Sequence, residues 1–83
     1  MFKIVYSDEA RKSLRKLPKI HLKRIFRAID VLKTEPHAGK KLQGELLEIY
    51  SIRAWPYRIL YRLFKKEITI LILDIGHRQG IYK

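Results

Sequence analysis

The sequence has no cysteine in its 83 residues, which excludes disulfides, thiolate nucleophiles and cysteine-based zinc sites together. Small secreted domains usually carry disulfides to compensate for a small core, so their absence favours the cytoplasm. No stretch near the N-terminus is apolar enough for a signal peptide. The longest apolar run, Ile68 to Leu73, is interrupted by Thr69 and is far shorter than the roughly 20 residues that span a bilayer. We therefore expect a cytoplasmic protein with no membrane partner.

Acidic residues are scarce: eight Asp and Glu oppose nineteen Lys and Arg, which gives a net charge of +11. The excess positive charges repel one another within a compact chain and attract polyanions. The candidate partners are nucleic acid, an anionic membrane surface and an acidic protein. A merely soluble basic protein is the weaker interpretation, because a few net charges suffice for solubility. The hydrophobic content of 47% excludes disorder, and the length fits one domain spanning 1–83.

Familiar catalytic spacings are missing as well. The chain has no Gly-rich phosphate loop, no nucleophile elbow and no His-Glu-x-x-His pattern. Asp74 and His77 alone are too few for a metal site, which needs three or four ligands. We therefore expect a chemistry of cationic and phenolic groups that uses neither a metal nor a cofactor.

The N-terminal half predicts one strand and two helices. Over residues 2–7, Phe2, Ile4 and Tyr6 recur at every second position, as in a strand. Ser7 suits a helix N-cap, and Pro18 both ends the first helix and fits the first turn of the second. Pro36 ends the second helix, and residues 34–44 predict a loop. The apolar stripe of the second helix consists of Leu22, Ile25, Phe26, Ile29 and Leu32.

The C-terminal half has the pattern of strands, which we expect near 46–54, 57–64 and 67–75. Residues 68–75 are nearly all aliphatic, which is typical of a strand covered on both faces. The order strand, two helices, three strands predicts an α+β domain. Its two N-terminal helices would pack on a small, largely antiparallel sheet.

Arginines gather in the strand half. Residues two apart on a strand share a face, so Arg58 and Arg62 point one way on their strand. If the expected strands 46–54 and 57–64 form a hairpin, Arg53 and Arg58 lie near each other across its end. An exposed sheet face more often mixes both signs of charge, which favours a functional role for this pair. For Arg62 we favour a solvated position.

Basic and phenolic side chains also crowd the C-terminal segment. Taken singly, Tyr82 is more readily a buried anchor, and His77 a capping or surface group, than a catalytic residue. Together with Arg78 they form a tail beside a basic sheet face, which suits an RNA phosphate. Eight further cations precede the first acid of the second helix and favour salt-sensitive contacts with RNA over a plain solvated face. They are Arg11, Lys12, Arg15, Lys16, Lys19, Lys23, Arg24 and Arg27.

Four short motifs follow one another along the whole chain. They are Ser7-Asp8-Glu9-Ala10 with a later Leu-x-x-Leu-Pro, Lys41-Leu42-Gln43-Gly44, Tyr57-Arg58-Ile59-Leu60-Tyr61, and Gly76-His77-Arg78 with Tyr82. Each is weak alone, but their order and spacing resemble RelE-type toxins of the RelE/ParE superfamily. The resemblance implies two N-terminal helices on a small sheet, in agreement with the pattern above.

The resemblance also implies the toxin of a type II toxin–antitoxin pair. Many RelE-type members cut mRNA in the ribosomal A site without a metal, through attack of the RNA 2′-hydroxyl on the adjacent phosphate. The implied partners are the ribosome, mRNA and a cognate antitoxin that is acidic and partly disordered when free. DNA would be contacted only through the antitoxin.

Carried over by position, Arg58 would bind the scissile phosphate, and Arg78 would assist it near the leaving oxygen. Arg53 would act electrostatically. Tyr82 would move a proton or stack on a base, with His77 as the alternative acid or base.

Two alternatives stay open. A ParE-like toxin shares the fold but poisons DNA gyrase. A relative that lacks a general acid or base would bind RNA or the ribosome without cutting. The sequence departs from active relatives at Ser51, where some carry lysine, and at Gly80, where an acid is common.

Overall fold

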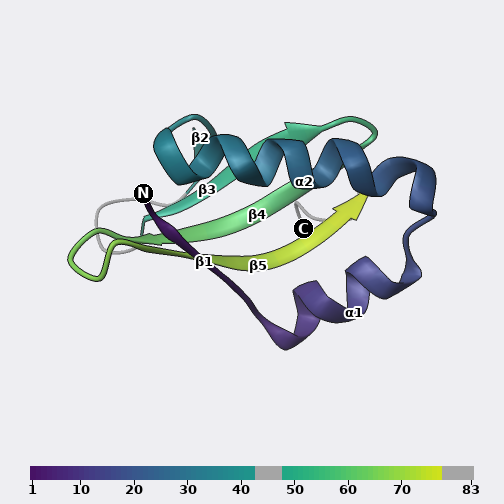
Figure 1. Cartoon of the computed structure of the whole chain (residues 1–83), viewed down its shortest axis with the longest axis horizontal. Helices are drawn as coiled ribbons and strands as arrows, with labels where there is room; N and C mark the ends of the chain where they lie inside the picture. Colours follow the sequence, from purple (N-terminus) through teal and green to yellow (C-terminus); the bar gives the residue numbers. More distant parts are fainter. Residues whose placement is uncertain (43–47, 78–83) are drawn as a thin grey trace.

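Figure 1 shows the fold in a computed structural model that describes residues 1–42 and 48–77. The predicted α+β class, with two N-terminal helices on a largely antiparallel sheet, is confirmed. In chain order the elements are β1 (Lys3–Tyr6), α1 (Asp8–Lys16), α2 (Lys19–Thr34), β2 (Lys40–Lys41), β3 (Ile49–Ala54), β4 (Tyr57–Phe64) and β5 (Thr69–His77).

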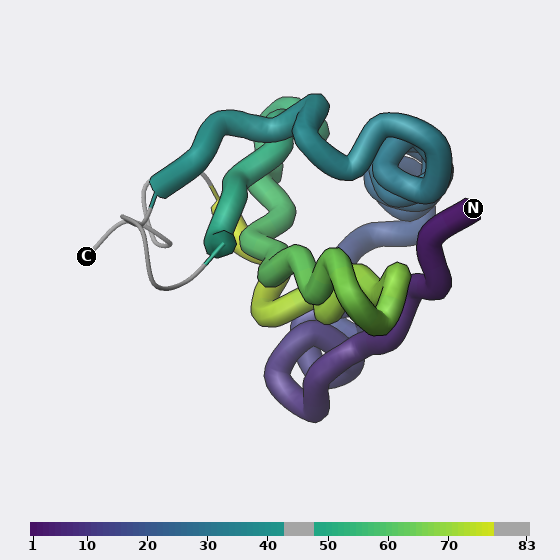
Figure 2. Tube along the Cα trace, turned by 90° about the vertical axis from the view of Figure 1, so that its left-hand side faces the viewer, coloured from purple at the N-terminus to yellow at the C-terminus, as the bar shows by residue number. Residues whose placement is uncertain are grey.

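The strands form one sheet in the order β1-β5-β4-β3-β2. β1 runs parallel to β5, and the other pairs are antiparallel. Figure 2 shows that the helices lie at separate places on the sheet, and contacts put α1 beside β5 and α2 against β3. Among the described residues, no helix is long and apolar enough to cross a membrane.

β2 was not expected, because Pro36 and Gly39 made its segment look like a loop. Its two lysines pair with Ser51 and Tyr50 of β3, and Leu42 N–H continues the pairing by donating to Ile49 O at 2.8 Å. The expected strand 57–64 agrees with β4, whereas β3 and β5 begin later than expected among the described residues. Residues 46 and 47 of the expected strand lie outside that description.

The core lies between the helices and one face of the sheet. α2 contributes Ile25, Ile29 and Leu32, so most of the predicted stripe is buried, although Phe26 is 42% exposed. β5 differs from the expectation of a strand covered on both faces. Its other face, which carries Leu71, is only half-buried. The sheet side of the core comprises Tyr50, Ala54, Ile59, Tyr61, Leu63, Ile70, Ile72 and Ile75.

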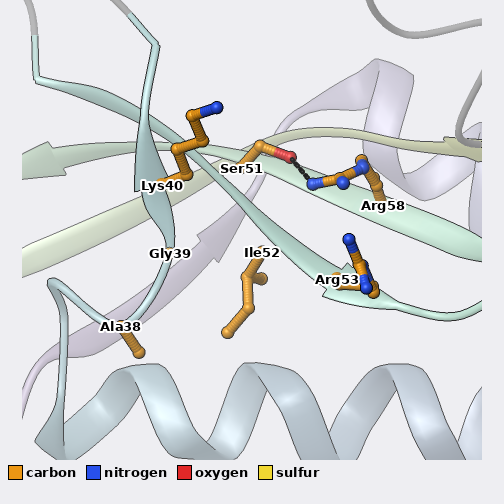
Figure 3. Close-up of a pocket in the computed structure, with 7 residues that line it drawn as sticks. All are labelled: Ala38, Gly39, Lys40, Ser51, Ile52, Arg53 and Arg58. Atoms are coloured by element: carbon orange, nitrogen blue, oxygen red, sulfur yellow. Dashed lines mark hydrogen bonds between the residues drawn. The ribbon is translucent and has the colours of Figure 1, made fainter.

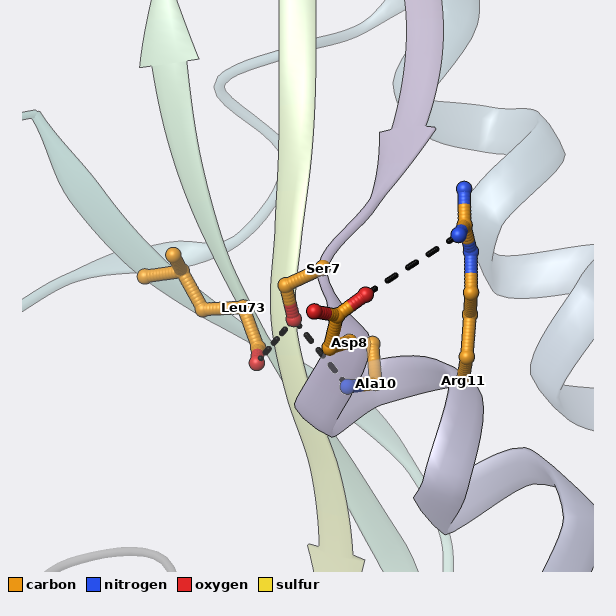
Figure 4. A network of polar contacts seen from close by, with 5 residues as sticks. All are labelled: Ser7, Asp8, Ala10, Arg11 and Leu73. Carbon is orange, nitrogen blue, oxygen red and sulfur yellow. Dashed lines mark hydrogen bonds and ion pairs between the residues drawn. The ribbon is translucent and has the colours of Figure 1, made fainter.

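Ser7 joins the start of α1 to the sheet, as Figure 4 shows. Its Oγ accepts a hydrogen bond from Ala10 N–H at 3.0 Å and donates one to Leu73 O at 2.8 Å. The first bond satisfies an amide that the helix cannot pair internally. The predicted N-cap is therefore confirmed, and it also fixes α1 against β5.

The substitution Ser7→Ala removes both bonds and should lower the free energy of unfolding by about 1–2 kcal/mol. In a domain of this size each kcal/mol lowers Tm by about 4–8 °C. Arg11→Ala is the control, since its 3.9 Å ion pair with Asp8 is exposed and should contribute under about 0.5 kcal/mol. Thermal unfolding of the three proteins tests this, and equal Tm values for Ser7→Ala and the parent protein would contradict it.

Candidate functional site

The β3–β4 hairpin brings two arginines together. The Cα atoms of Arg53 and Arg58 are register partners, and residues directly opposite each other in an antiparallel pair share a face. Ser51 lies on this same face, whereas Tyr50 and Ile59 point into the core. The predicted hairpin and its division into an arginine face and an apolar face are thus confirmed.

The two arginines line an open pocket of about 470 Å³ between β2, β3 and β4 (Figure 3). Of the residues that the structure describes, those lining it include three cations and no acid. Like charges placed opposite each other destabilise a strand pair, so a bound anion would relieve this repulsion. The lining consists of Ala38, Gly39, Lys40, Ser51, Ile52, Arg53 and Arg58. Within residues 1–42 and 48–77, no three His, Cys, Asp or Glu side chains gather as metal ligands.

Arg58 and Arg53 differ in their surroundings. Arg58 is half-buried, and its Nη1 lies 3.5 Å from Ser51 Oγ, a long and therefore weak hydrogen bond. Ser51 itself is only 2% exposed, so it lies packed within the sheet beside the guanidinium. Arg53 is exposed and lies next to Arg58 in Figure 3. The cation of Arg58 is thus partly enclosed, whereas that of Arg53 extends the positive surface towards solvent.

A buried phenol anchors the loop that lines one side of the pocket. Tyr61 OH donates to Pro36 O at 2.8 Å and accepts from Gly39 N–H at 3.1 Å. Gly39 approaches so closely that a Cβ there would lie 2.7 Å from both Ser51 O and Tyr61 OH. This anchor was not predicted from the sequence, where its only visible signal is a glycine shortly after Pro36.

Three tyrosines of the described part are held as phenols. Burial raises the pKa of Tyr50 to about 12, helped by its hydrogen bond to Glu48 and by the charge of that carboxylate. Burial also raises the pKa of Tyr61, against a smaller opposite effect of the Gly39 N–H. For Tyr6, burial and the charge of Asp30 raise the pKa. These phenols stay protonated at neutral pH, so none of the three suits a general base.

His77 lies on the other side of the sheet from the arginine pair. Its Cα pairs with that of Tyr57, and the two rings meet edge-on with 6.1 Å between centroids. The ring of Tyr57 also meets His21 of α2 at 5.1 Å, which places it on the helix-covered face. The structure therefore brings Arg53 and Arg58 together but leaves His77 across the sheet. Arg78 and Tyr82 lie outside the described residues.

All eight cations singled out on the helices are exposed. Lys23, Arg24 and Arg27 line one shallow hollow on α2. Arg24 and Arg27 also border a groove whose far wall includes Arg53, and Arg24 Nη1 donates to Trp55 O at 2.8 Å. The positive surface of α2 thus continues into the arginine pair. Four others lie on α1, beside β5: Arg11, Lys12, Arg15 and Lys16.

Comparison with known proteins shows the family of the chain. The profile of the family described as ParE toxin of type II toxin–antitoxin system, parDE, matches residues 4–82. Toxin RelG of Mycobacterium tuberculosis is 36% identical over 99% of this chain and 97% of its own. The putative toxin RelE1 of Methanocaldococcus jannaschii is 30% identical over 99% of this chain and 96% of its own.

Solved structures agree with the sequence comparison. A chain of the archaeal RelE–RelB complex from Pyrococcus horikoshii superposes with a TM-score of 0.84 and 29% identity, over 95% of this chain and 97% of that one. A chain of the toxin–antitoxin complex RelBE2 from Mycobacterium tuberculosis gives 0.80 and 35%, over 93% and 98%. The sequence resemblance is thereby confirmed. This chain belongs to the RelE/ParE superfamily and is the toxin of a type II toxin–antitoxin system.

Proposed function

We propose that this toxin is an endoribonuclease that cuts mRNA in the ribosomal A site without a metal ion. The observation that supports the proposal most strongly is the pairing of Arg53 with Arg58 in an open pocket whose described lining has no acid. Such a pocket attracts a phosphate, and a guanidinium matches phosphate geometry with two parallel donors.

The reaction is transesterification within the RNA. The 2′-oxygen loses its proton and bonds to the adjacent phosphorus, the bond from phosphorus to the 5′-oxygen breaks, and that oxygen takes up a proton. Negative charge on the phosphoryl oxygens rises in the transition state. We propose that the half-buried guanidinium of Arg58 stabilises this charge and that Arg53 adds its field.

For proton transfer we propose Tyr82, with Arg78 beside the leaving oxygen. The buried tyrosines are unsuitable because their raised pKa keeps them protonated. His77 is disfavoured because it faces Tyr57 on the opposite side of the sheet from Arg58. Guanidinium groups near Tyr82 would favour its phenolate and so make it a better base.

The positive helices suit a large polyanion. We propose that the exposed cations of α1 and α2 hold the protein on ribosomal RNA in the cytoplasm. A cognate antitoxin, acidic and partly disordered when free, would cover the same surface. This fits the solved relatives, which are RelE–RelB complexes. DNA would be contacted only through that antitoxin.

Poisoning of DNA gyrase is the second candidate, because the matching family profile is described as a ParE toxin. The two targets separate in one experiment on purified toxin, with gyrase supercoiling and translation of a defined mRNA measured in parallel. Our proposal expects translation to stop with new mRNA 5′ ends while supercoiling continues. Inhibited supercoiling with intact mRNA would replace it by the gyrase function. Arrested translation with intact mRNA would indicate a ribosome binder that does not cut.

A further inference from the structure

Lys40 is a third cation of the arginine pocket. Its Cα pairs with that of Ser51, so both side chains lie on the face that carries Arg58. Figure 3 shows Lys40 and Arg58 on either side of Ser51. Lys40 belongs to β2, which the sequence pattern had assigned to a loop, so its place opposite Ser51 was hidden.

The backbone of Lys40 is fixed although its side chain is exposed. The preceding residue, Gly39, packs directly on Ser51 O and is bonded to the fully buried Tyr61. On the other side, Leu42 N–H donates to Ile49 O at 2.8 Å. The ammonium group therefore lies at the end of a flexible side chain whose Cα is held beside the pocket.

Lys41 offers an internal comparison, since it is adjacent, exposed and of the same charge. Its Cα pairs with Tyr50, which belongs to the opposite face. The hydrogen bonds from Lys65 and Tyr50, followed by the positive charges of Lys65 and Lys41, lower the pKa of Glu48. The charge of Lys41 thus acts on a carboxylate. Lys40 instead lines a pocket together with two arginines, and none of the described residues that line this pocket is acidic.

We propose that Lys40 binds the RNA phosphate next to the scissile one, so that the site holds two successive phosphates. The assignment rests on the proposed ribonuclease function. Diagonal neighbours on adjacent strands are about 7–8 Å apart at their Cα atoms, and Lys40 and Arg53 stand in this relation across β2 and β3. One cation cluster therefore serves the reacting phosphate, and a separate cation holds the chain beside it.

The test couples a substitution to a single phosphate. Full-length toxin variants bind programmed ribosomes whose mRNA carries a 2′-deoxy nucleotide at the cut site, which prevents cleavage. In two further mRNAs, the phosphate on the 5′ side or the phosphate on the 3′ side of that site is a neutral methylphosphonate. Relative to the mRNA with normal phosphates, the parent toxin and Lys41→Gln should lose roughly tenfold in affinity for one of the two methylphosphonate mRNAs. Lys40→Gln should bind that mRNA and the normal one equally, and Lys40→Arg should restore the difference.

The outcomes separate the two proposals. Equal methylphosphonate penalties in Lys40→Gln and Lys41→Gln would overturn the role of Lys40, even if unmodified mRNA is cut. Failure to cut unmodified mRNA would overturn the ribonuclease function. A penalty lost only in Lys40→Gln would then show that Lys40 contacts an RNA phosphate, but no scissile phosphate would lie beside it. Circular dichroism and thermal unfolding of each variant show whether a loss of affinity reflects a loss of fold.

Discussion

Replacing Arg58 with alanine should lower the single-turnover rate of mRNA cleavage on programmed ribosomes by about 10²–10³-fold. The guanidinium is half-buried beside Ser51, so it is positioned before the reaction begins. Its loss removes charge stabilisation in the transition state more than binding, because many exposed cations remain to hold the ribosome. Arg58→Lys should recover part of the rate, since it restores the charge but not the two parallel donors.

The matched control is Arg62→Ala. Arg62 lies on the same strand and the same face, but its guanidinium sits over the ring of Phe64, 4.5 Å from the centroid. It does not line the arginine pocket, so its removal should change the cleavage rate by less than about twofold, whereas the stacked contact contributes about 0.5–1 kcal/mol to stability. Similar rate losses in Arg58→Ala and Arg62→Ala would show that the positive face acts only through its overall charge.

Gly39→Ala should destabilise the fold by about 1–3 kcal/mol, because the added methyl group forces a close-packed site apart. The new Cβ would lie 2.7 Å from the backbone oxygen of Ser51 in a central strand, which has little freedom to move. A shift of the loop would also stretch the bond from Gly39 N–H to Tyr61 OH. Since Lys40 follows directly, we expect weaker RNA binding as well as a lower Tm.

Chemical denaturation and ribosome binding measure the two effects of Gly39→Ala. Ala38→Ser serves as the stability control, because it adds one atom at an exposed neighbouring position and should stay within about 0.5 kcal/mol of the parent protein. If Gly39→Ala unfolds at the same denaturant concentration as Ala38→Ser, the loop is not packed as tightly as the contacts to Ser51 and Tyr61 indicate.

The arginine pair was predictable because local rules determine it. Alternation places Arg58 on one face of its strand, and a tight connection around Trp55 makes the two strands a hairpin. The apolar residues of both strands disfavour a slip by one residue, which would expose Tyr50 and Ile59, whereas the exact register follows only from the structure. The same reasoning gave the fold class.

Features that depend on contacts between distant segments were not predictable. The anchor between Tyr61 and the loop at Gly39 joins residues 22 apart and leaves no local pattern. The side of His77 depends on an irregularity of the β4–β5 pairing, where Tyr61 faces Ile72 but Leu60 faces Asp74. One extra residue in a strand reverses the faces of all that follow. The aliphatic run of β5 gave no sign of it.

The decisive measurement is cleavage of a defined mRNA by purified toxin, with and without programmed ribosomes. We expect a cut within the A-site codon only when ribosomes are present, leaving a 2′,3′-cyclic phosphate and a free 5′-hydroxyl. A 2′-deoxy nucleotide at the cut site should stop the reaction, because it removes the attacking oxygen. Intact mRNA in both arms, from folded toxin that still arrests growth, would contradict the account.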